Sequence, residues 1–305
     1  MARDQSIGIT TGRSPYRVWW IAIRPKTLWA AVSPVVVGTA IAYADGYFHA
    51  PSALVALLCA LLIQIGTNLH NDYADFEKGA DTESRKGPLR VTQAGLLAPE
   101  KVKQATYLTF ALAFIAGLYL VFRGGWPILI VGILSILSGF WYTGGKYSLA
   151  YRGWADLFVI LFFGLIAVGG TYYVQALSIT PYVLIAGIGP GLLADAILVV
   201  NNLRDWLEDK RAGKRTTVVR FGKTFAYLHY AFCIYGAAFI PIFLFVMTGL
   251  RPWSMLASGI IFLARPQQQM LRHYKDPQEL NPVLGKTARL LLIYSILFSI
   301  GQIVS

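Results

Sequence analysis

Long apolar segments, separated by stretches rich in Lys and Arg, dominate this chain. A helix that crosses a bilayer needs about 20 mostly apolar residues. Nine segments approach that requirement, near residues 28–45, 52–71, 104–122, 126–142, 154–174, 181–201, 225–248, 252–264 and 288–304, the eighth being the shortest. Only 14% of the residues are charged and 56% are hydrophobic, whereas about a quarter are charged in ordinary globular domains. The sequence therefore predicts an all-α integral membrane protein with about nine transmembrane helices.

The basic residues are distributed very unevenly between the two sides of such a bundle. If the N-terminus is cytoplasmic and nine helices alternate, 25 of the 27 Lys and Arg residues lie on the cytoplasmic side. Only Arg123 and Arg251 lie outside. This bias follows the positive-inside rule and predicts a multi-pass protein of the cell inner membrane with a cytoplasmic N-terminus. Loops beside anionic lipid account for the net charge of +12, so no nucleic-acid partner is expected.

No polar segment is long enough to form an independent core, so we expect a single domain over residues 1–305. The two acidic clusters described next lie 133 residues apart at matched ends of apolar segments. That correspondence favours two related helical halves around a central cavity. The sequence does not indicate an oligomeric state.

Two acidic clusters end two of the apolar segments and share the pattern Asn-x-x-x-Asp. The first contains Asn68, Asn71, Asp72 and Asp75, and the second contains Asn201, Asn202, Asp205 and Asp209. Steps of three and four residues place each set on one helical face. Stacked carboxylates repel one another, and a hard cation such as Mg²⁺, which binds carboxylates together with substrate phosphates, relieves that repulsion. Solvated helix ends are the alternative, but acids at a helix C-terminus oppose the macrodipole. We therefore expect Mg²⁺ and a diphosphate between the two faces.

Basic residues accompany both clusters. We expect Arg204 and Lys214 to act in catalysis, and the others to bind substrate: Arg24, Lys26, Lys86, Arg90 and Arg215. Lys and Arg stabilise the charge that gathers on a departing diphosphate. The alternative for each single residue is a purely topological role. Tyr142 and Tyr147 are common membrane-interface anchors, but their rings also suit a carbocation, and we expect them to bind substrate.

Four further polar or sulfur-containing residues need an interpretation. Asp195 lies inside an apolar segment, where an acid either faces the cavity or takes part in a buried hydrogen-bond network. Cys59 and Cys233 also fall inside apolar segments. They read as small hydrophobes, because no metal or disulfide spacing is present. His70 points away from the carboxylate face and reads as structural.

These motifs together resemble the UbiA-type intramembrane aromatic prenyltransferases, and most closely their 1,4-dihydroxy-2-naphthoate branch. The resemblance covers nearly the whole chain. It rests on Arg-Pro-Lys-Thr (24–27), Asn-Leu-His-Asn-Asp-Tyr-Ala-Asp (68–75) with Gly79 and Asp81, Gly-Pro-Leu-Arg (87–90), Tyr-Thr-Gly-Gly (142–145), Phe-Phe-Gly (162–164), and Asn-Asn-Leu-Arg-Asp (201–205) with Ala-Gly-Lys-Arg-Thr (212–216). Two residues depart from the usual pattern, Lys146 in place of Pro and Asp156 in place of Glu.

The resemblance implies a reaction and a metal. Mg²⁺ would be held by Asp72, Asp75, Asp81, Asp205 and Asp209, and would bind the diphosphate of a polyprenyl or phytyl donor. Ionisation gives an allylic cation, which the carboxylate-bearing ring carbon of 1,4-dihydroxy-2-naphthoate attacks with loss of carbon dioxide. The product is a demethylmenaquinol or demethylphylloquinol. The cytoplasmic end of the bundle would hold this site, and the bilayer-facing bundle would hold the prenyl tail.

Two alternatives remain open at this point. The same chemistry could use another acceptor, namely 4-hydroxybenzoate, homogentisate, a chlorophyllide or haem. An ion-coupled transporter would also use carboxylates to bind a cation. A transporter is expected to place them near the bilayer midplane, whereas here they lie at segment ends.

Overall fold

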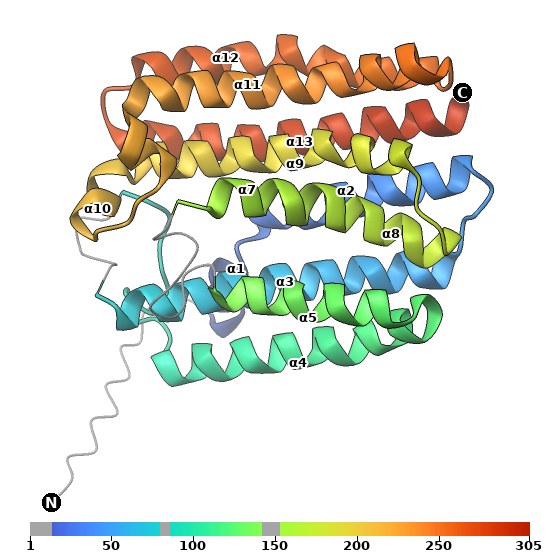
Figure 1. Cartoon of the computed structure of the whole chain (residues 1–305). Helices are drawn as coiled ribbons and strands as arrows, with labels where there is room; N and C mark the ends of the chain where they lie inside the picture. Colours follow the sequence, from blue (N-terminus) through green and yellow to red (C-terminus); the bar gives the residue numbers. More distant parts are fainter. Residues whose placement is uncertain (1–13, 80–85, 142–152) are drawn as a thin grey trace, which may run out of the picture.

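The computed structural model describes residues 14–79, 86–141 and 153–305, and all regular structure within these ranges is helical (Figure 1). The elements are α1 (Pro15–Ile23), α2 (Pro25–Ala44), α3 (Ala50–Glu77), α4 (Pro99–Gly124), α5 (Trp126–Trp141), α7 (Ala155–Val159), the π-helix η1 (Ile160–Ile166), α8 (Ala167–Ala176), α9 (Pro181–Arg204), α10 (Trp206–Arg211), α11 (Thr217–Thr248), the 3₁₀-helix η2 (Pro252–Gly259), α12 (Ile260–His273), the 3₁₀-turn η3 (Pro277–Glu279) and α13 (Leu280–Val304). The predicted all-α class is confirmed.

Seven helices in the described ranges are long and apolar enough to cross a membrane. They are Pro25–Ala44, Ala50–Glu77, Pro99–Gly124, Ala155–Ala176, Pro181–Arg204, Thr217–Thr248 and Pro277–Val304. Two of the nine expected segments form shorter elements. The fourth is α5, with 16 residues, and the eighth divides into η2 and the start of α12. A multi-pass membrane protein is confirmed on these seven spans.

Proline starts many of these helices. It occupies the first or second position of α1, α2, α3, α4 and α9, where its missing N–H has no intrahelical partner to lose. Other prolines lie inside spans, at Pro34 in α2, Pro190 in α9 and Pro241 in α11. Neighbouring helices satisfy the backbone groups that such residues free in a membrane bundle.

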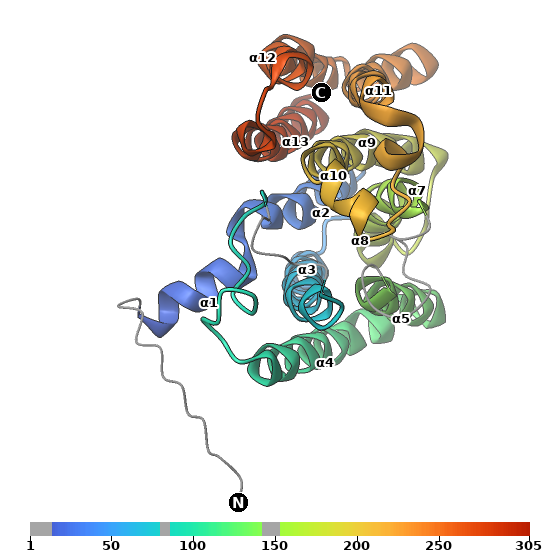
Figure 2. The same ribbon diagram turned by 90° about the vertical axis from the view of Figure 1, so that its left-hand side faces the viewer.

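The long helices lie side by side, and α3 and α9 both end at the end of the bundle that carries α10 (Figure 1). The view turned by 90° shows α3, α4 and α5 as one group and α11, α12 and α13 as another (Figure 2). Helices α2, α8 and α9 lie between the two groups, and α2 packs on both α13 and α8. This arrangement brings the two acidic clusters to the same end.

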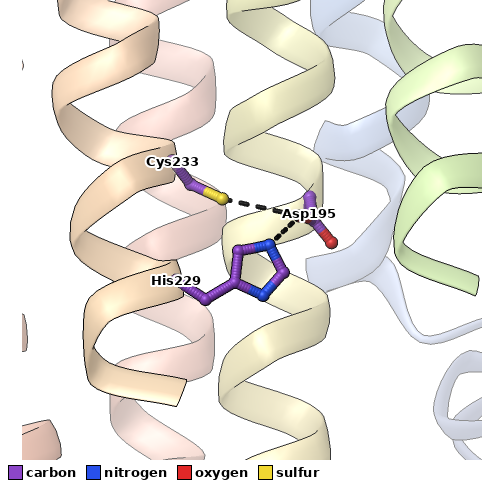
Figure 3. Close-up of side chains that lie close together, drawn as sticks. All are labelled: Asp195, His229 and Cys233. Atoms are coloured by element: carbon purple, nitrogen blue, oxygen red, sulfur yellow. Dashed lines mark hydrogen bonds and ion pairs between the residues drawn. The ribbon is translucent and has the colours of Figure 1, made fainter. Parts of the chain in front are cut away.

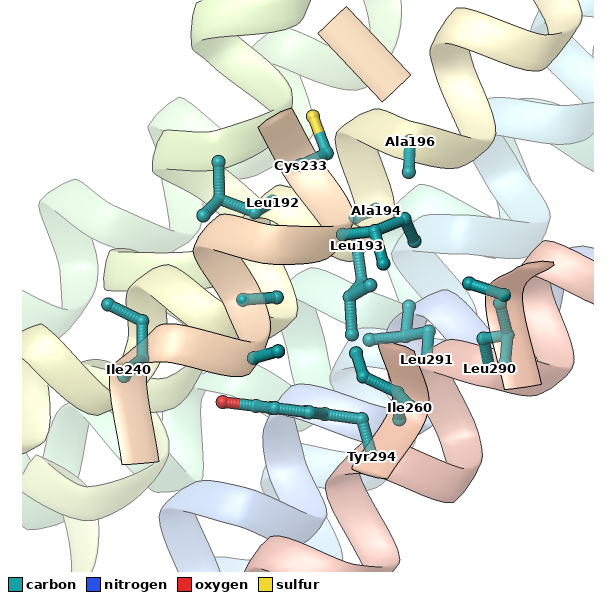
Figure 4. Packing of buried hydrophobic residues seen from close by; sticks show 14 of the residues in the cluster. Leu192, Leu193, Ala194, Ala196, Cys233, Ile240, Ile260, Leu290, Leu291 and Tyr294 are labelled. Atoms are coloured by element: carbon teal, nitrogen blue, oxygen red, sulfur yellow. The ribbon is translucent and has the colours of Figure 1, made fainter. Parts of the chain in front are cut away.

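The main apolar core lies where α9, α11 and α13 meet (Figure 4). Leu193, Ile260, Leu291 and Tyr294 are fully buried there. Their contacts fix α9, which carries the second acidic cluster, against the C-terminal helices. Dispersion contacts of this kind, rather than water exclusion, hold helices together inside a bilayer.

Small residues let the π-helix η1 approach α9 closely. A Cβ added at Gly164 would lie 2.7 Å from the carbonyl oxygen of Gly187, and one at Gly191 would lie 2.8 Å from that of Ile160. Backbones meet this closely in membranes where glycine occupies both helices. The contact positions α7 and η1 so that Phe158 and Phe162 line the cavity described below.

Candidate active site

A cavity of about 380 Å³ opens between α2, α3, α5, η1 and α9, at the end of the bundle that carries α10. Its walls further along the bundle are apolar, and its mouth is charged. The charged and amide side chains at the mouth are Arg24, Lys26, Asn68, Asn71, Asp75, Arg90, Asn201, Asn202, Arg204, Asp205, Glu208, Asp209 and Lys214. Residues of the two acidic clusters, which are far apart in the sequence, therefore line one cavity.

Asp75 is the carboxylate of α3 that lines the cavity. It is 3% exposed, and its Oδ2 accepts a hydrogen bond of 2.7 Å from the Arg90 guanidinium. Its Oδ1 is buried and has no hydrogen-bond partner in the described ranges. A buried carboxylate oxygen without a partner is costly, so this atom is suited to accept a cation from the cavity.

Asp72 is oriented differently, although it lies only three residues before Asp75. Its carboxylate accepts hydrogen bonds from the backbone amides of Val91 (3.1 Å) and Thr92 (3.0 Å) and from the Thr92 hydroxyl. Arg24 approaches the same carboxylate at 3.7 Å. Asp72 is 1% exposed and does not line the cavity. It therefore holds the loop that carries Arg90.

Asn68 joins the start of α2 to α3. Its side-chain amide donates to the carbonyl of Ile23 and to the Thr27 hydroxyl, both at 2.8 Å. Between these two partners lies Arg24, which adopts a left-handed backbone conformation with φ of 56°. The two hydrogen bonds from Asn68 hold this strained turn in place. The turn directs the Arg24 side chain to the cavity mouth.

The second cluster is organised around Arg204 at the end of α9. Its guanidinium donates two hydrogen bonds of 2.7 and 2.6 Å to the two carboxylate oxygens of Asp205. It also donates to Asn201 at 2.8 Å and to Asn281 of α13 at 3.1 Å. Arg204 is 3% exposed. A buried bidentate pair of this kind has a fixed geometry, so Arg204 aligns Asp205 and Asn201 together.

Asp209, the last member of the second cluster, lies in the short helix α10 and is buried. Lys214 lies 3.2 Å from its carboxylate. Burial raises the pKa of Asp209 to about 6; the charge of Lys214 opposes the shift, whereas Asp205 and Asp75 add to it. The carboxylates of Asp75 in α3, Asp205 between α9 and α10, and Asp209 in α10 therefore act on one another electrostatically.

Lys86 contacts both the second cluster and α13 through its backbone. The backbone amide of Lys86 donates to Glu208 at 3.0 Å, and its carbonyl accepts from Asn281 at 3.0 Å. The Lys86 side chain itself lies 3.9 Å from Asp276, away from the cavity lining. Lys86 thus contributes through its backbone.

Three predicted residues, Asp81, Tyr142 and Tyr147, lie outside the described residues. Among the described predictions, Asp72, Lys86 and Arg215 do not line the cavity. Asp72 and Lys86 hold loops, whereas Arg215 is exposed beside the backbone of Gly153. Sequence spacing placed all three near the clusters but could not give the direction of their side chains.

Some residues of the site were not among the sequence predictions. Phe158 and Phe162 line the cavity as a stacked pair, with ring centroids 5.9 Å apart. Their spacing of four residues was a usable signal. Glu208 lies between Asp205 and Asp209 in sequence and also lines the cavity. Asn281 reaches both Arg204 and Lys86 from a distant helix, and no local pattern indicates that role.

Of the two interpretations of Asp195, its position favours the buried hydrogen-bond network. Its carboxylate points to α11, where it contacts His229 and Cys233 (Figure 3). Ala194 and Ile197 of the same helix line the cavity, but Asp195 does not.

The donors at the cavity mouth fit a hard divalent cation. Carboxylate and amide oxygens are the protein ligands that Mg²⁺ prefers, and Asp75, Asp205 and Asp209 provide such oxygens around one space. The buried Oδ1 of Asp75 in particular has a lone pair with no protein donor in the described ranges. Arg90, Arg204 and Lys214 at the same mouth suit an anionic ligand, so a metal–diphosphate pair matches both sets of charges.

Fold and site together define a multi-pass helical membrane protein with a charged cavity mouth and an apolar interior. Such a cavity suits an amphipathic substrate that has an anionic head and a lipid tail. Comparison with known proteins makes this class more specific.

The UbiA prenyltransferase family matches residues 31–292. The chain is 36% identical to the 1,4-dihydroxy-2-naphthoate octaprenyltransferase of Escherichia coli, over 95% of this chain and 96% of that protein. It is 35% identical to the protein of the same name from Haemophilus influenzae, over 94% and 96%. A UbiA homologue from Aeropyrum pernix has the same fold, with a TM-score of 0.67, 15% identity and coverage of 92% and 98%. A homologue from Archaeoglobus fulgidus, described as bound to DMAPP and Mg²⁺, gives a TM-score of 0.61 at 16% identity, with coverage of 92% and 99%.

This chain belongs to the UbiA prenyltransferase family. The family resemblance inferred from the motifs is confirmed. The chain is thus a membrane-embedded prenyltransferase.

Proposed function

We propose that this protein transfers a polyprenyl group from its diphosphate to 1,4-dihydroxy-2-naphthoate, releasing diphosphate and carbon dioxide. The observation that supports this proposal most directly is one cavity lined by the carboxylates of Asp75, Asp205 and Asp209 and by five cationic side chains, above an apolar interior. The names of the curated relatives, which specify the naphthoate acceptor and an octaprenyl donor, support the same reaction. A menaquinone-type precursor is the product, and a phytyl donor fits the same scheme.

We assign the donor's diphosphate to the cavity mouth. Asp75, Asp205 and Asp209 would hold Mg²⁺, which supplies Lewis-acid stabilisation of the diphosphate as its bond to carbon breaks. Lys214 and Arg90 add positive charge beside the same position, since both line the mouth. Positive groups aimed at the developing charge of a leaving group lower the barrier. Asn71, Asn201 and Asn202 provide neutral donors and acceptors around them.

The apolar half of the cavity suits the allylic cation that remains. Phe158 and Phe162 line it, and aromatic rings attract cations. The carboxylate-bearing carbon of the naphthoate ring forms the new C–C bond. The C–CO₂ bond then breaks and returns its electron pair to the ring. The departing group is carbon dioxide rather than a proton, so this step requires no base to remove a ring hydrogen.

We also propose a topology and a domain organisation. Helix α5 and the η2–α12 pair would cross the bilayer with the seven longer spans, giving nine crossings and a cytoplasmic N-terminus. The concentration of 25 of 27 basic residues on one side supports this orientation. With this orientation, the cavity mouth would lie on the cytoplasmic side of the inner membrane. The whole chain, 1–305, would form one domain.

The first test of the function uses the purified protein with 1,4-dihydroxy-2-naphthoate, a polyprenyl diphosphate and Mg²⁺. Mass spectrometry is expected to detect a prenylated, decarboxylated naphthoquinol that disappears when EDTA is present. Parallel reactions with 4-hydroxybenzoate and homogentisate serve as acceptor controls. Product only with another acceptor would contradict the naphthoate assignment. Solute uptake into proteoliposomes without diphosphate release would instead indicate a transporter.

A second cavity offers a test of where the prenyl tail lies. It measures about 160 Å³, is lined almost entirely by apolar groups of α3, α4, α5 and α8, and shares Ala60, Ile63, Ser135 and Ala167 with the main cavity. We propose that longer donors extend past these four residues. Gly170 lines this second cavity, and a Cβ there meets nothing within 4 Å. Gly170→Leu would therefore add side-chain volume to this cavity.

Gly170→Leu is expected to lower use of long donors relative to geranyl diphosphate by roughly 10-fold, because an overfilled apolar site costs about 1–3 kcal/mol. The measurement is the ratio of kcat/KM values for a short and a long donor. Gly259→Leu is the matched control, since its Cβ also meets nothing within 4 Å and it lines neither cavity. An unchanged ratio would show that the tail follows another route.

A further inference from the structure

Four reactive side chains gather behind α9, away from the cavity. Asp195 of α9, His229 and Cys233 of α11 and Asp156 of α7 come from three elements (Figure 3 shows the first three). The Asp195 Oδ2 lies 2.8 Å from His229 Nε2 and 3.5 Å from Cys233 Sγ. Asp156 lies 4.0 Å from the other ring nitrogen of His229. The proposed prenyl transfer uses none of these residues, and none of them lines the cavity.

Hydrogen bonds within the described ranges do not satisfy this cluster. Asp195 Oδ1, Asp156 Oδ2 and His229 Nδ1 are all buried without a partner there. Asp195 is 0% exposed. Two carboxylates face one imidazole, and no described Lys or Arg forms a salt bridge with either of them. Buried carboxylates without compensation are strongly unfavourable, so the arrangement calls for an additional positive charge.

We propose that Asp195, His229 and Cys233 form a binding site for a divalent transition-metal ion of the zinc type. Their ligand atoms all lie within 4.8 Å of one another. His229 and Cys233 are four residues apart, so they share one face of α11, and Asp195 faces them from α9 (Figure 3). Nitrogen, sulfur and oxygen donors suit zinc, whose sites are tetrahedral and often combine three protein ligands with one open position.

Asp156 lies beside the ring nitrogen of His229 that would not bind the metal. A histidine that binds a metal usually donates its other ring N–H to a carboxylate, which orients the ring. Asp156 faces that second nitrogen of His229, and the Thr217 hydroxyl holds Asp156 at 3.2 Å. The side chains of His229 and Asp156 are 14% and 11% exposed, so protein atoms do not fully enclose the cluster.

The proposed ion would differ from Mg²⁺ at the cavity mouth in both chemistry and role. Mg²⁺ prefers oxygen ligands and octahedral geometry, whereas a thiolate selects softer metals. Binding would remove the Cys233 thiol proton, because the thiolate is the metal ligand. The ion would connect α9, which carries Asn201 and Arg204, to α11. With water or another small ligand in its fourth position, the ion would stabilise the helix that supports the second acidic cluster.

Cobalt(II) binding to the purified full-length protein in detergent tests this proposal. Wild-type protein is expected to show a sulfur-to-cobalt charge-transfer band in the near ultraviolet and intense visible bands of a tetrahedral site. Zn²⁺ should displace both. Cys233→Ser should lose the charge-transfer band, and Cys59→Ser, which alters the other buried cysteine, should retain it. Asp209→Asn should also retain it, which separates this site from the cavity mouth.

A stability measurement keeps the proposal testable if a variant folds poorly. Zn²⁺ is expected to raise the Tm of wild-type protein and of Cys59→Ser, and to leave the Tm of Asp195→Asn unchanged. Absence of the charge-transfer band from wild-type protein, or its persistence in Cys233→Ser, would overturn the proposal. In that case the cluster is a hydrogen-bond network only.

Discussion

Replacing Asp75 or Asp209 with asparagine is expected to reduce prenyl transfer by about 10²–10³-fold, the loss seen when a preorganised electrostatic group is removed from a reaction centre. Asparagine keeps the size of the side chain but removes its negative charge. Asp75 contributes a buried carboxylate oxygen without a protein partner in the described ranges. Asp209 contributes a carboxylate that faces Lys214 and both other acids. Each variant should need a higher Mg²⁺ concentration for half-maximal rate.

The rate is measured at several Mg²⁺ concentrations on protein whose membrane insertion has been checked. Glu100→Gln is the control, because Glu100 is an exposed carboxylate in the first turn of α4 and lies outside the cavity lining. It should keep full activity. Wild-type turnover by Asp75→Asn and Asp209→Asn at every Mg²⁺ concentration would contradict their assignment as metal ligands.

Much of the fold followed from hydropathy alone. Apolar stretches of bilayer length predicted a multi-pass helical protein, and the seven long helices confirm that class. Hydropathy did not resolve the less regular segments. The fourth expected segment forms α5, a helix of 16 residues. The fifth contains the π-helix η1, whose close approach to α9 depends on Gly164, Gly187 and Gly191. Packing of this kind depends on pairs of residues distant in the chain.

The site was predictable to the level of residue clusters. Helical spacing placed each acidic cluster on one face of its helix, and matched helix ends placed both clusters on one side of the membrane. Asp75, Asp205 and Asp209 line one cavity. The same spacing made Asp72 and Asp75 equivalent, because both lie on the acidic face. Residues 90–92 distinguish them, because the amides of Val91 and Thr92 reach Asp72 whereas the Arg90 guanidinium reaches Asp75. The spacing of acidic residues within α3 does not indicate where residues 90–92 lie.

This separation has a measurable consequence at Asp72. Asp72→Asn is expected to lower kcat by roughly 10–100-fold while the Mg²⁺ concentration for half-maximal rate stays at the wild-type value. Asparagine presents an NH₂ group to one of the donors that Asp72 now accepts, and a buried donor left without a partner costs about 1–3 kcal/mol. The loop from Val91 to Thr92 loosens, and Arg90 loses its alignment on Asp75. Asp72 thus acts as a positioning residue.

Thr92→Val provides a graded comparison, because it removes only the hydroxyl bond to Asp72 and keeps the backbone amide bond. It should lie between wild-type protein and Asp72→Asn in kcat, with the same Mg²⁺ requirement. Limited proteolysis within residues 86–98 should follow the same order. If Asp72→Asn instead raises the Mg²⁺ requirement as far as Asp75→Asn does, Asp72 binds the metal directly. A changed Mg²⁺ requirement distinguishes a ligand from a residue that holds the loop, because only a ligand alters the metal's own binding free energy.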